Sequence, residues 1–246
     1  MIRSFYIQPR TSPKAKLHHL MSKRYRVIIF LSILVSDLVA VHGQYKIAEY
    51  FLKPLIVIWL MSWFALQLRY VHSNLKKWIF FALFFSWLGD VLLMFHNDDS
   101  LFFLLGLSSF LISHIFYILF FHIVRIREMV KSRWYLLLIV VVYYAVIIAI
   151  LSPFLGDMLM PVRIYAVVIS FMFLLAMHML FIKNTSTGLW MTAGALLFVI
   201  SDSLLAINKF YHPFEMAGVF VMSTYGLAQL FLTEGAIRYI SSNFKE

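Results

Sequence analysis

The stretch LFFLLGLSSFLISHIFYILFFHI, from Leu101 to Ile123, contains no Asp, Glu, Lys or Arg. About 20 apolar residues in an α-helix cross the roughly 30 Å hydrocarbon core of a bilayer. This stretch is therefore expected to span a membrane as one helix. Its few polar side chains can bond to backbone carbonyls or to neighbouring helices, so they do not argue against a span.

The rest of the chain has the same character. Of its 246 residues, 63% are hydrophobic and 13% are charged, whereas soluble domains are about half apolar and about a quarter charged. We predict an all-α polytopic membrane protein with eight transmembrane helices. The predicted spans lie near Tyr25 to Val41, Pro54 to Leu68, Trp78 to Phe95, Leu101 to Ile123, Trp134 to Leu151, Val162 to Ile182, Leu189 to Ile207 and Met216 to Ile237.

The loops between these spans alternate in charge. Seventeen Lys and Arg residues fall in the N-terminal segment, the C-terminal segment and alternate loops, and four fall in the remaining loops. Because cytoplasmic loops are enriched in Lys and Arg, both termini are predicted to be cytoplasmic, in the inner membrane if the source is bacterial. The predicted divisions are a basic cytoplasmic arm (1–24), an eight-helix transmembrane domain (25–237) and a short cytoplasmic tail (238–246). A cleaved signal peptide is disfavoured, because Asp37 interrupts the first span and no small-residue cleavage site follows.

The composition also excludes several kinds of chemistry and partner. The formal net charge is +10, but the basic residues lie between apolar runs and not on one surface, so no nucleic acid partner is predicted. The chain has no Cys, which excludes thiol nucleophiles and thiolate metal sites. No cofactor is predicted. A zinc site is disfavoured, because His122 and His178 are predicted far from the acidic residues.

Three acidic residues lie inside predicted spans. Asp37, Asp90 and Asp202 each fall four or five residues from the end of their span that is predicted to be outside. Charged groups in hydrocarbon are costly unless they are paired or hydrated, so each is a candidate functional residue. Asp90 and Asp202 could instead pair structurally with a nearby lysine, and Asp37 could reach the membrane surface.

Other polar residues are predicted to lie near this acidic layer. His114 is mid-span, Ser201 flanks Asp202, and Lys53 lies at the outer end of its span. Together they predict a polar chamber that opens outward, with cations at its rim. The alternative for the uncharged residues is a role in hydrogen bonds between helices. The further members of this predicted chamber are Tyr117, Arg163, Asn208, Lys209, Tyr225 and Gln229.

Two segments, one in each half of the chain, have weakly similar sequences. The segment Ser86–Leu93 around Asp90 resembles Phe198–Leu205 around Asp202, each with a small residue before Asp and two leucines after it. At the same offset Gly106 meets Gly218. Two four-helix halves repeated in parallel would explain this, and chance similarity explains it as well, because Gly, Ser and Leu are common in spans.

At these residues the chain resembles the YhhN family of membrane proteins, over about residues 45–237. The characterised members of that family are lysoplasmalogenases. The two Asp motifs in paired spans are the most specific part of the match. The matching stretches are Lys53-Pro54-Leu55, Trp87-Leu88-Gly89-Asp90 with Leu92-Leu93, Gly106-Leu107 with Phe110, His114 and Tyr117, Gly194-Ala195 through Phe198, Ser201-Asp202-Ser203, Ala206 and Asn208 to Phe210, and Tyr225 with Gln229.

The resemblance implies hydrolysis of the vinyl ether bond of lysoplasmalogens, with a lysophospholipid as substrate. Asp90 and Asp202 are then the expected acid and carboxylate of a two-carboxyl mechanism, in either order, with His114 orienting a carboxyl group or water. Tyr117, Ser201, Asn208, Tyr225 and Gln229 are expected to bind the glycerol hydroxyls, and Lys53, Arg163 and Lys209 the phosphate. The alternatives are a proton-coupled or lipid transporter, which would also need embedded acidic residues, and a purely structural membrane protein.

Overall fold

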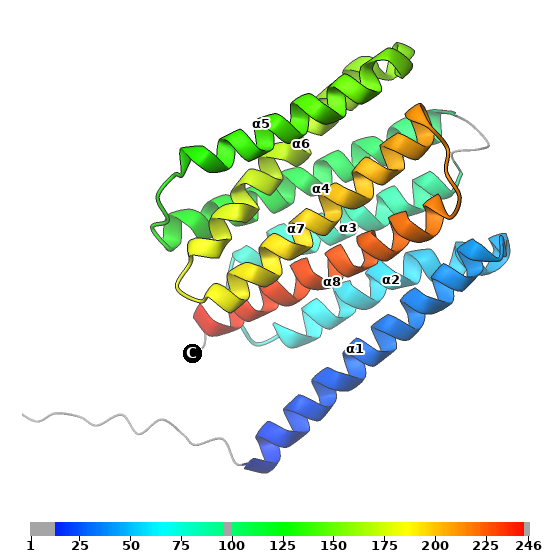
Figure 1. Cartoon of the computed structure of the whole chain (residues 1–246). Helices are drawn as coiled ribbons and strands as arrows, with labels where there is room; N and C mark the ends of the chain where they lie inside the picture. The colour runs from blue at the N-terminus through cyan, green and yellow to red at the C-terminus, as the bar shows by residue number, and fades with distance from the viewer. Residues whose placement is uncertain (1–12, 96–99, 244–246) are drawn as a thin grey trace, which may run out of the picture.

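The computed structural model describes residues 13–95 and 100–243, which form eight long α-helices and no strand (Figure 1). The fold is all-α, as predicted. Short helical turns η1 (Ser152–Phe154) and η2 (Gly156–Met158) join α5 to α6, η3 (Met179–Phe181) follows α6, and the π-helix η4 (Ile207–Tyr211) continues α7. The long helices are α1 (Pro13–His42), α2 (Lys46–Gln67), α3 (Leu75–Met94), α4 (Ser100–Arg127), α5 (Trp134–Leu151), α6 (Leu159–His178), α7 (Thr185–Ala206) and α8 (Ala217–Asn243).

Seven of the described helical segments are long and apolar enough to cross a membrane, so the chain is an integral multi-pass membrane protein. The exception is α8, which is 27 residues long but carries Gln229, Thr233 and Glu234 along its length. All three of these side chains are buried, as is most of α8. Because α8 faces other helices and little lipid, its surface does not have to be uniformly apolar.

Two helices extend beyond the predicted spans. Helix α1 begins at Pro13, inside the segment predicted to be a basic arm, and proline suits the first turn of a helix because its missing N–H would have no partner there. Helix α8 continues to Asn243, so most of the predicted tail is helical. Residues 1–12, with Arg3 and Arg10 of the predicted arm, and residues 244–246 lie outside the described part of the chain.

The helices form one bundle of nearly aligned rods (Figure 1). In its centre α3 packs closely on α4 and α7 on α8, while α1 covers α2 and α8 at one edge and α5 lies on α6 at the other. Asp37, Asp90 and Asp202 lie four or five residues before the ends of α1, α3 and α7. These helices run in the same direction, so the three carboxyl groups share one end of the bundle, as predicted. We call it the aspartate end.

Small and hydroxyl residues bring the central helices together. The Ser113 hydroxyl donates to the Ala82 carbonyl at 2.8 Å, and Ser86 donates to Ser113 at 2.8 Å, which ties α4 to α3. A Cβ atom at Gly194 of α7 would lie 2.8 Å from the backbone nitrogen of Leu232 in α8. Only glycine therefore fits this contact without a shift of one backbone.

The packing agrees with the predicted repeat of two four-helix halves. Residues that are 112 positions apart would be equivalent, and Tyr117 donates a 2.8 Å hydrogen bond to Gln229, its own equivalent. Such a contact arises where two equivalent halves meet at their symmetry axis. Helix α2 also packs on α8, and the equivalent α6 packs on α4.

Candidate active site

Three helices bring a histidine, a tyrosine and an aspartate together at the aspartate end. The Tyr165 hydroxyl of α6 donates a hydrogen bond to Oδ2 of Asp202 in α7. The Nε2 atom of His114, in α4, lies 3.2 Å from the same oxygen and 2.9 Å from the Tyr165 hydroxyl. His114 is fully buried, whereas the Asp202 side chain is 14% exposed. The carboxyl group is therefore held by buried donors and remains reachable.

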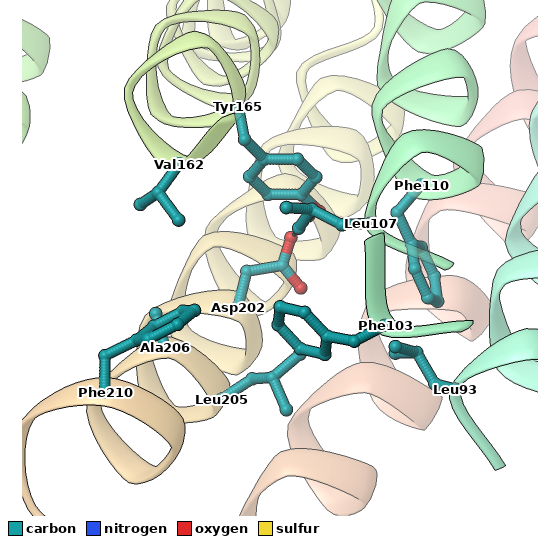
Figure 2. Close-up of a pocket in the computed structure, with 10 residues that line it drawn as sticks. All are labelled: Leu93, Phe103, Leu107, Phe110, Val162, Tyr165, Asp202, Leu205, Ala206 and Phe210. Carbon is teal, nitrogen blue, oxygen red and sulfur yellow. Dashed lines mark hydrogen bonds between the residues drawn. The ribbon is translucent and has the colours of Figure 1, made fainter. Parts of the chain in front are cut away.

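The geometry defines which nitrogen of His114 carries hydrogen. Tyr165 uses its one hydrogen on Asp202, so Nε2 must act as the donor toward the two oxygens that it contacts. The other ring nitrogen, Nδ1, has no hydrogen-bond partner in the described part of the chain. One oxygen of Asp202 thus accepts from two groups. Figure 2 shows the other oxygen directed toward Phe103.

Asp202 lines a largely apolar cavity of about 40 Å³, which we call the Asp202 pocket (Figure 2). One water molecule requires roughly 10–15 Å³ of such a volume, so the cavity has room for water beside the carboxyl group. Tyr165 is the other polar side chain in its wall. The remaining lining residues are Leu93, Phe103, Leu107, Phe110, Val162, Leu205, Ala206 and Phe210.

A second cavity lies on the other side of Asp202, between α5, α6 and α7. It shares Val162, Tyr165, Asp202 and Ala206 with the Asp202 pocket, and we call it the apolar pocket. The rest of its wall is mainly aliphatic. This second cavity has a volume of about 30 Å³, so Asp202 lies at the junction of two small, largely apolar cavities. The further lining residues are Tyr143, Ile147, Ile148, Leu151, Ala166, Ile169 and Ser203.

A third cavity, of about 200 Å³, adjoins the Asp202 pocket through Leu93, Phe103 and Leu205, which line both. Three charged side chains line it, so we call it the charged pocket. Lys53 lies in its wall, and the Nζ atom of Lys209 is 5.1 Å from the centre of the Phe103 ring. Its other lining residues are Val41, Glu49, Asn208, Ala217, Gly218, Val221 and Met222.

Asp90 has a different environment. Its carboxyl group is 2% exposed and accepts a 2.6 Å hydrogen bond from the Tyr225 hydroxyl of α8. It lines none of the three cavities. The ring of Phe198 contacts both Tyr225, at 5.5 Å between centroids, and His114, at 4.7 Å. Aromatic packing therefore separates the two carboxyl clusters.

The model of the YhhN family matches residues 48–236, which include every residue of both carboxyl clusters. The chain belongs to the YhhN family.

Three curated relatives of this YhhN family member are named lysoplasmalogenase. Lysoplasmalogenase TMEM86A of Homo sapiens is 30% identical over 188 residues, which are 75% of this chain and 75% of that protein. The Bos taurus protein of the same name is 30% identical over 189 residues, again 75% of each chain. Lysoplasmalogenase TMEM86B of Homo sapiens is 37% identical over 82 residues, 33% of each. No solved structure matches this chain.

The predicted site residues of this YhhN chain divide into two groups. His114 meets Asp202, and Lys53, Asn208 and Lys209 line the charged pocket. The others lie elsewhere. The Tyr117 hydroxyl bonds to Gln229, the Ser201 hydroxyl donates to the Val221 carbonyl at 3.0 Å, Tyr225 bonds to Asp90, and Arg163 lines none of the three cavities.

The structure also bears on the other roles considered for the acidic residues, which are pairing with lysine, exposure at the membrane surface and metal binding. In the described residues no lysine forms an ion pair with Asp90 or Asp202. Asp37 is fully buried and both its carboxyl oxygens lack a hydrogen-bond partner there, so it does not reach the surface. Within the same described ranges, no group of three His, Asp or Glu side chains is arranged to hold a metal ion.

Two residues that the sequence analysis did not select belong to this site. Tyr165 contacts both His114 and Asp202, and Glu49 lines the charged pocket. Tyr165 had a usable signal, because it lies near the outer end of its predicted span, at the depth of the acidic layer. Glu49 lies just outside a predicted span, where a charged residue is ordinary and does not indicate a functional site.

Proposed function

We propose that this chain hydrolyses the vinyl ether bond of lysoplasmalogens, releasing a fatty aldehyde and a glycerophospho-alcohol. Two curated relatives named lysoplasmalogenase cover three quarters of the chain, which supports this class of reaction. The observation that carries the proposal is the position of Asp202. It is a carboxyl group that accepts hydrogen bonds from His114 and Tyr165, at the junction of two largely apolar cavities.

The reaction needs an acid and then a water molecule. Transfer of a proton to the β-carbon of the vinyl ether uses the electrons of the double bond and leaves an oxocarbenium ion at the carbon that carries oxygen. Water adds to that carbon and loses a proton, which gives a hemiacetal. The hemiacetal then breaks its bond to the glycerol oxygen, which takes up a proton as the aldehyde forms. The sum is the addition of one water molecule, with no oxidation or reduction.

In this scheme Asp202 gives the proton and, as the carboxylate, takes one back from the attacking water. His114 and Tyr165 position it by their hydrogen bonds to Oδ2. Asp90 lines no cavity, so we assign it an electrostatic role. A negative charge in an apolar surrounding stabilises the cationic intermediate across a short distance without contact.

The same arrangement suggests how the lipid lies. The alkenyl chain occupies the Asp202 pocket and the apolar pocket, and the glycerophosphate end extends past Phe103 into the charged pocket. There Lys53 and Lys209 supply the positive charge that a phosphate requires. This orientation puts the vinyl ether next to Asp202.

The test uses purified protein in detergent and three lipids with the same head group. Aldehyde release is expected from the alkenyl lysolipid only, because the saturated ether lacks the double bond and the ester lacks a carbon that accepts the proton. Both analogues are expected to inhibit competitively. Ester cleavage at a comparable rate would contradict the mechanism and indicate acyl transfer to a nucleophile.

The transporter alternative makes a different prediction. A proton-coupled carrier in sealed vesicles would move lipid or protons across the bilayer without forming aldehyde, and its embedded acidic groups would be reachable from both sides. Here Asp37, Asp90 and Asp202 share one end of the bundle, which favours hydrolysis. Transport without aldehyde formation would overturn the proposal.

A further inference from the structure

The charged pocket contains an acidic group as well as basic ones. Glu49 and Lys53 come from α2, and Lys209 comes from η4 across the cavity. A phosphate alone requires only the two lysines. The carboxylate therefore needs an explanation of its own.

Glu49 and Lys53 have the i, i+4 spacing, with Glu first, that favours an ion pair along a helix. No such pair forms between them, nor between Glu49 and Lys209, although the described residues include all three. Glu49 also makes no side-chain hydrogen bond within the described ranges. Opposite charges thus line one cavity without an ion pair between them, and the Glu49 carboxylate is left available to a ligand.

The shape of the cavity indicates how a ligand would lie in it. Its apolar wall of Leu93, Phe103 and Leu205 is shared with the Asp202 pocket. A ligand that reaches Asp202 with an apolar chain therefore brings its polar end into the charged pocket. The ligand that matches both signs of charge there carries a phosphate and a cation close together.

We propose that Glu49 binds the positively charged amine of a zwitterionic lysophospholipid head group, while Lys53 and Lys209 bind its phosphate. This inference rests on the proposed function, because it takes the lysophospholipid as the ligand. Glu49 then determines specificity: it favours choline and ethanolamine head groups over a phosphate monoester, whose extra negative charge lies near the carboxylate.

The experiment measures binding, so that it does not depend on catalysis. Full-length protein in detergent is titrated with two saturated-ether lysolipids of equal chain length, one with a phosphocholine head group and one that ends at the phosphate. The wild type is expected to bind the phosphocholine lipid more tightly. Glu49→Gln keeps the shape of the side chain and removes its charge. It is expected to weaken phosphocholine binding by about 3- to 10-fold, the size of one partly exposed charge contact, and to leave the phosphate monoester unchanged or tighter.

Two further variants complete the comparison. Glu215→Gln removes an exposed carboxylate that lies at the same end of the bundle but lines none of the three cavities. It is expected to change the affinity for neither lipid. Glu49→Lys is expected to reverse the preference, which a general loss of folding cannot do.

Equal weakening of both lipids by Glu49→Gln, or a wild type without preference for the phosphocholine lipid, would overturn the role of Glu49. Aldehyde release is measured separately with the alkenyl lipid. A wild type that binds with the expected preference yet releases no aldehyde would contradict the proposed function and support the head-group site.

Discussion

Asp90 and Asp202 each lie four residues before the end of their helix, within similar short motifs, yet their surroundings differ. Asp202 has a side chain that is 14% exposed, lines two cavities and accepts from His114 and Tyr165. Asp90 is 2% exposed and bonds to Tyr225. The short sequence motif that they share places a carboxyl group at one depth in a bundle. Neighbouring helices decide whether that group meets a cavity.

The neighbours also differ at positions that are 112 residues apart. The residue 112 positions before Tyr165 is Lys53, which lines the charged pocket, whereas Tyr165 donates to Asp202. The residue 112 positions after His114 is Gly226, where an added Cβ would lie 2.5 Å from the Leu34 side chain. The first half thus supplies an imidazole to the aspartate of the second half, whereas the second half has at the corresponding position a glycine packed against Leu34.

The largest expected effect is at Asp202. Asp202→Asn keeps the shape but can neither transfer a proton nor act as a carboxylate, so aldehyde release should fall about 10³-fold or more. Thermal unfolding in detergent should change little. Asp157→Asn, an exposed change in η2, is the matched control. A variant at residue 202 with wild-type turnover would remove Asp202 from the mechanism.

His114→Ala should reduce turnover about 10²-fold, because Asp202 loses one of its two donors. His114→Gln restores an N–H donor of similar reach and should recover a large part of the loss. Equal loss in both variants would indicate that His114 only fills space.

Asp90→Asn should reduce turnover by about 10-fold, clearly less than Asp202→Asn, because Asp90 acts at a distance. Substrate KM should stay near the wild-type value, since Asp90 lines none of the three cavities. If Asp90→Asn abolishes aldehyde release as completely as Asp202→Asn, both carboxyl groups act directly and the distinction between them fails.

The smallest effect on activity is expected where the two halves meet. Tyr117→Phe removes the hydrogen bond to Gln229 and leaves a buried amide without its partner. The free energy of unfolding should fall by about 1 kcal/mol, while turnover stays within about twofold of wild type. Ser223→Ala, at a half-buried position on α8, the helix that carries Gln229, is the stability control. A loss of turnover without a loss of stability would place Tyr117 in the site.

The sequence predicted the parts of this picture that depend on one helix at a time. Apolar runs located the spans, and the depth of Asp90 and Asp202 in their runs predicted their shared layer. The contact of His114 with Asp202 joins α4 to α7. It depends on how each helix is rotated about its axis relative to the others, and the residue pattern within one helix does not determine that rotation. For the same reason the sequence could not predict three interhelical hydrogen bonds. They are made by the side chains of Ser201, Tyr225 and Gln229, which were expected in the polar chamber.

The rim cations show the same limit. Lys53, Arg163 and Lys209 were all predicted at the outer ends of spans, and two of them line the charged pocket. Arg163 follows Val162, which faces the cavities, and the 100° turn between successive helix residues directs it elsewhere. Depth along a helix was predictable, whereas direction around it was not.

The most direct test of the role of Asp202 is an experimental structure of the Asp202→Asn protein with an intact lysoplasmalogen bound. The β-carbon of the vinyl ether should lie in contact with the side chain at position 202, with the alkenyl chain in the apolar pocket and the phosphate near Lys53 and Lys209. A lipid whose vinyl ether lies against Asp90, or at the opposite end of the bundle, would contradict the assignment of Asp202 as the reacting carboxyl group.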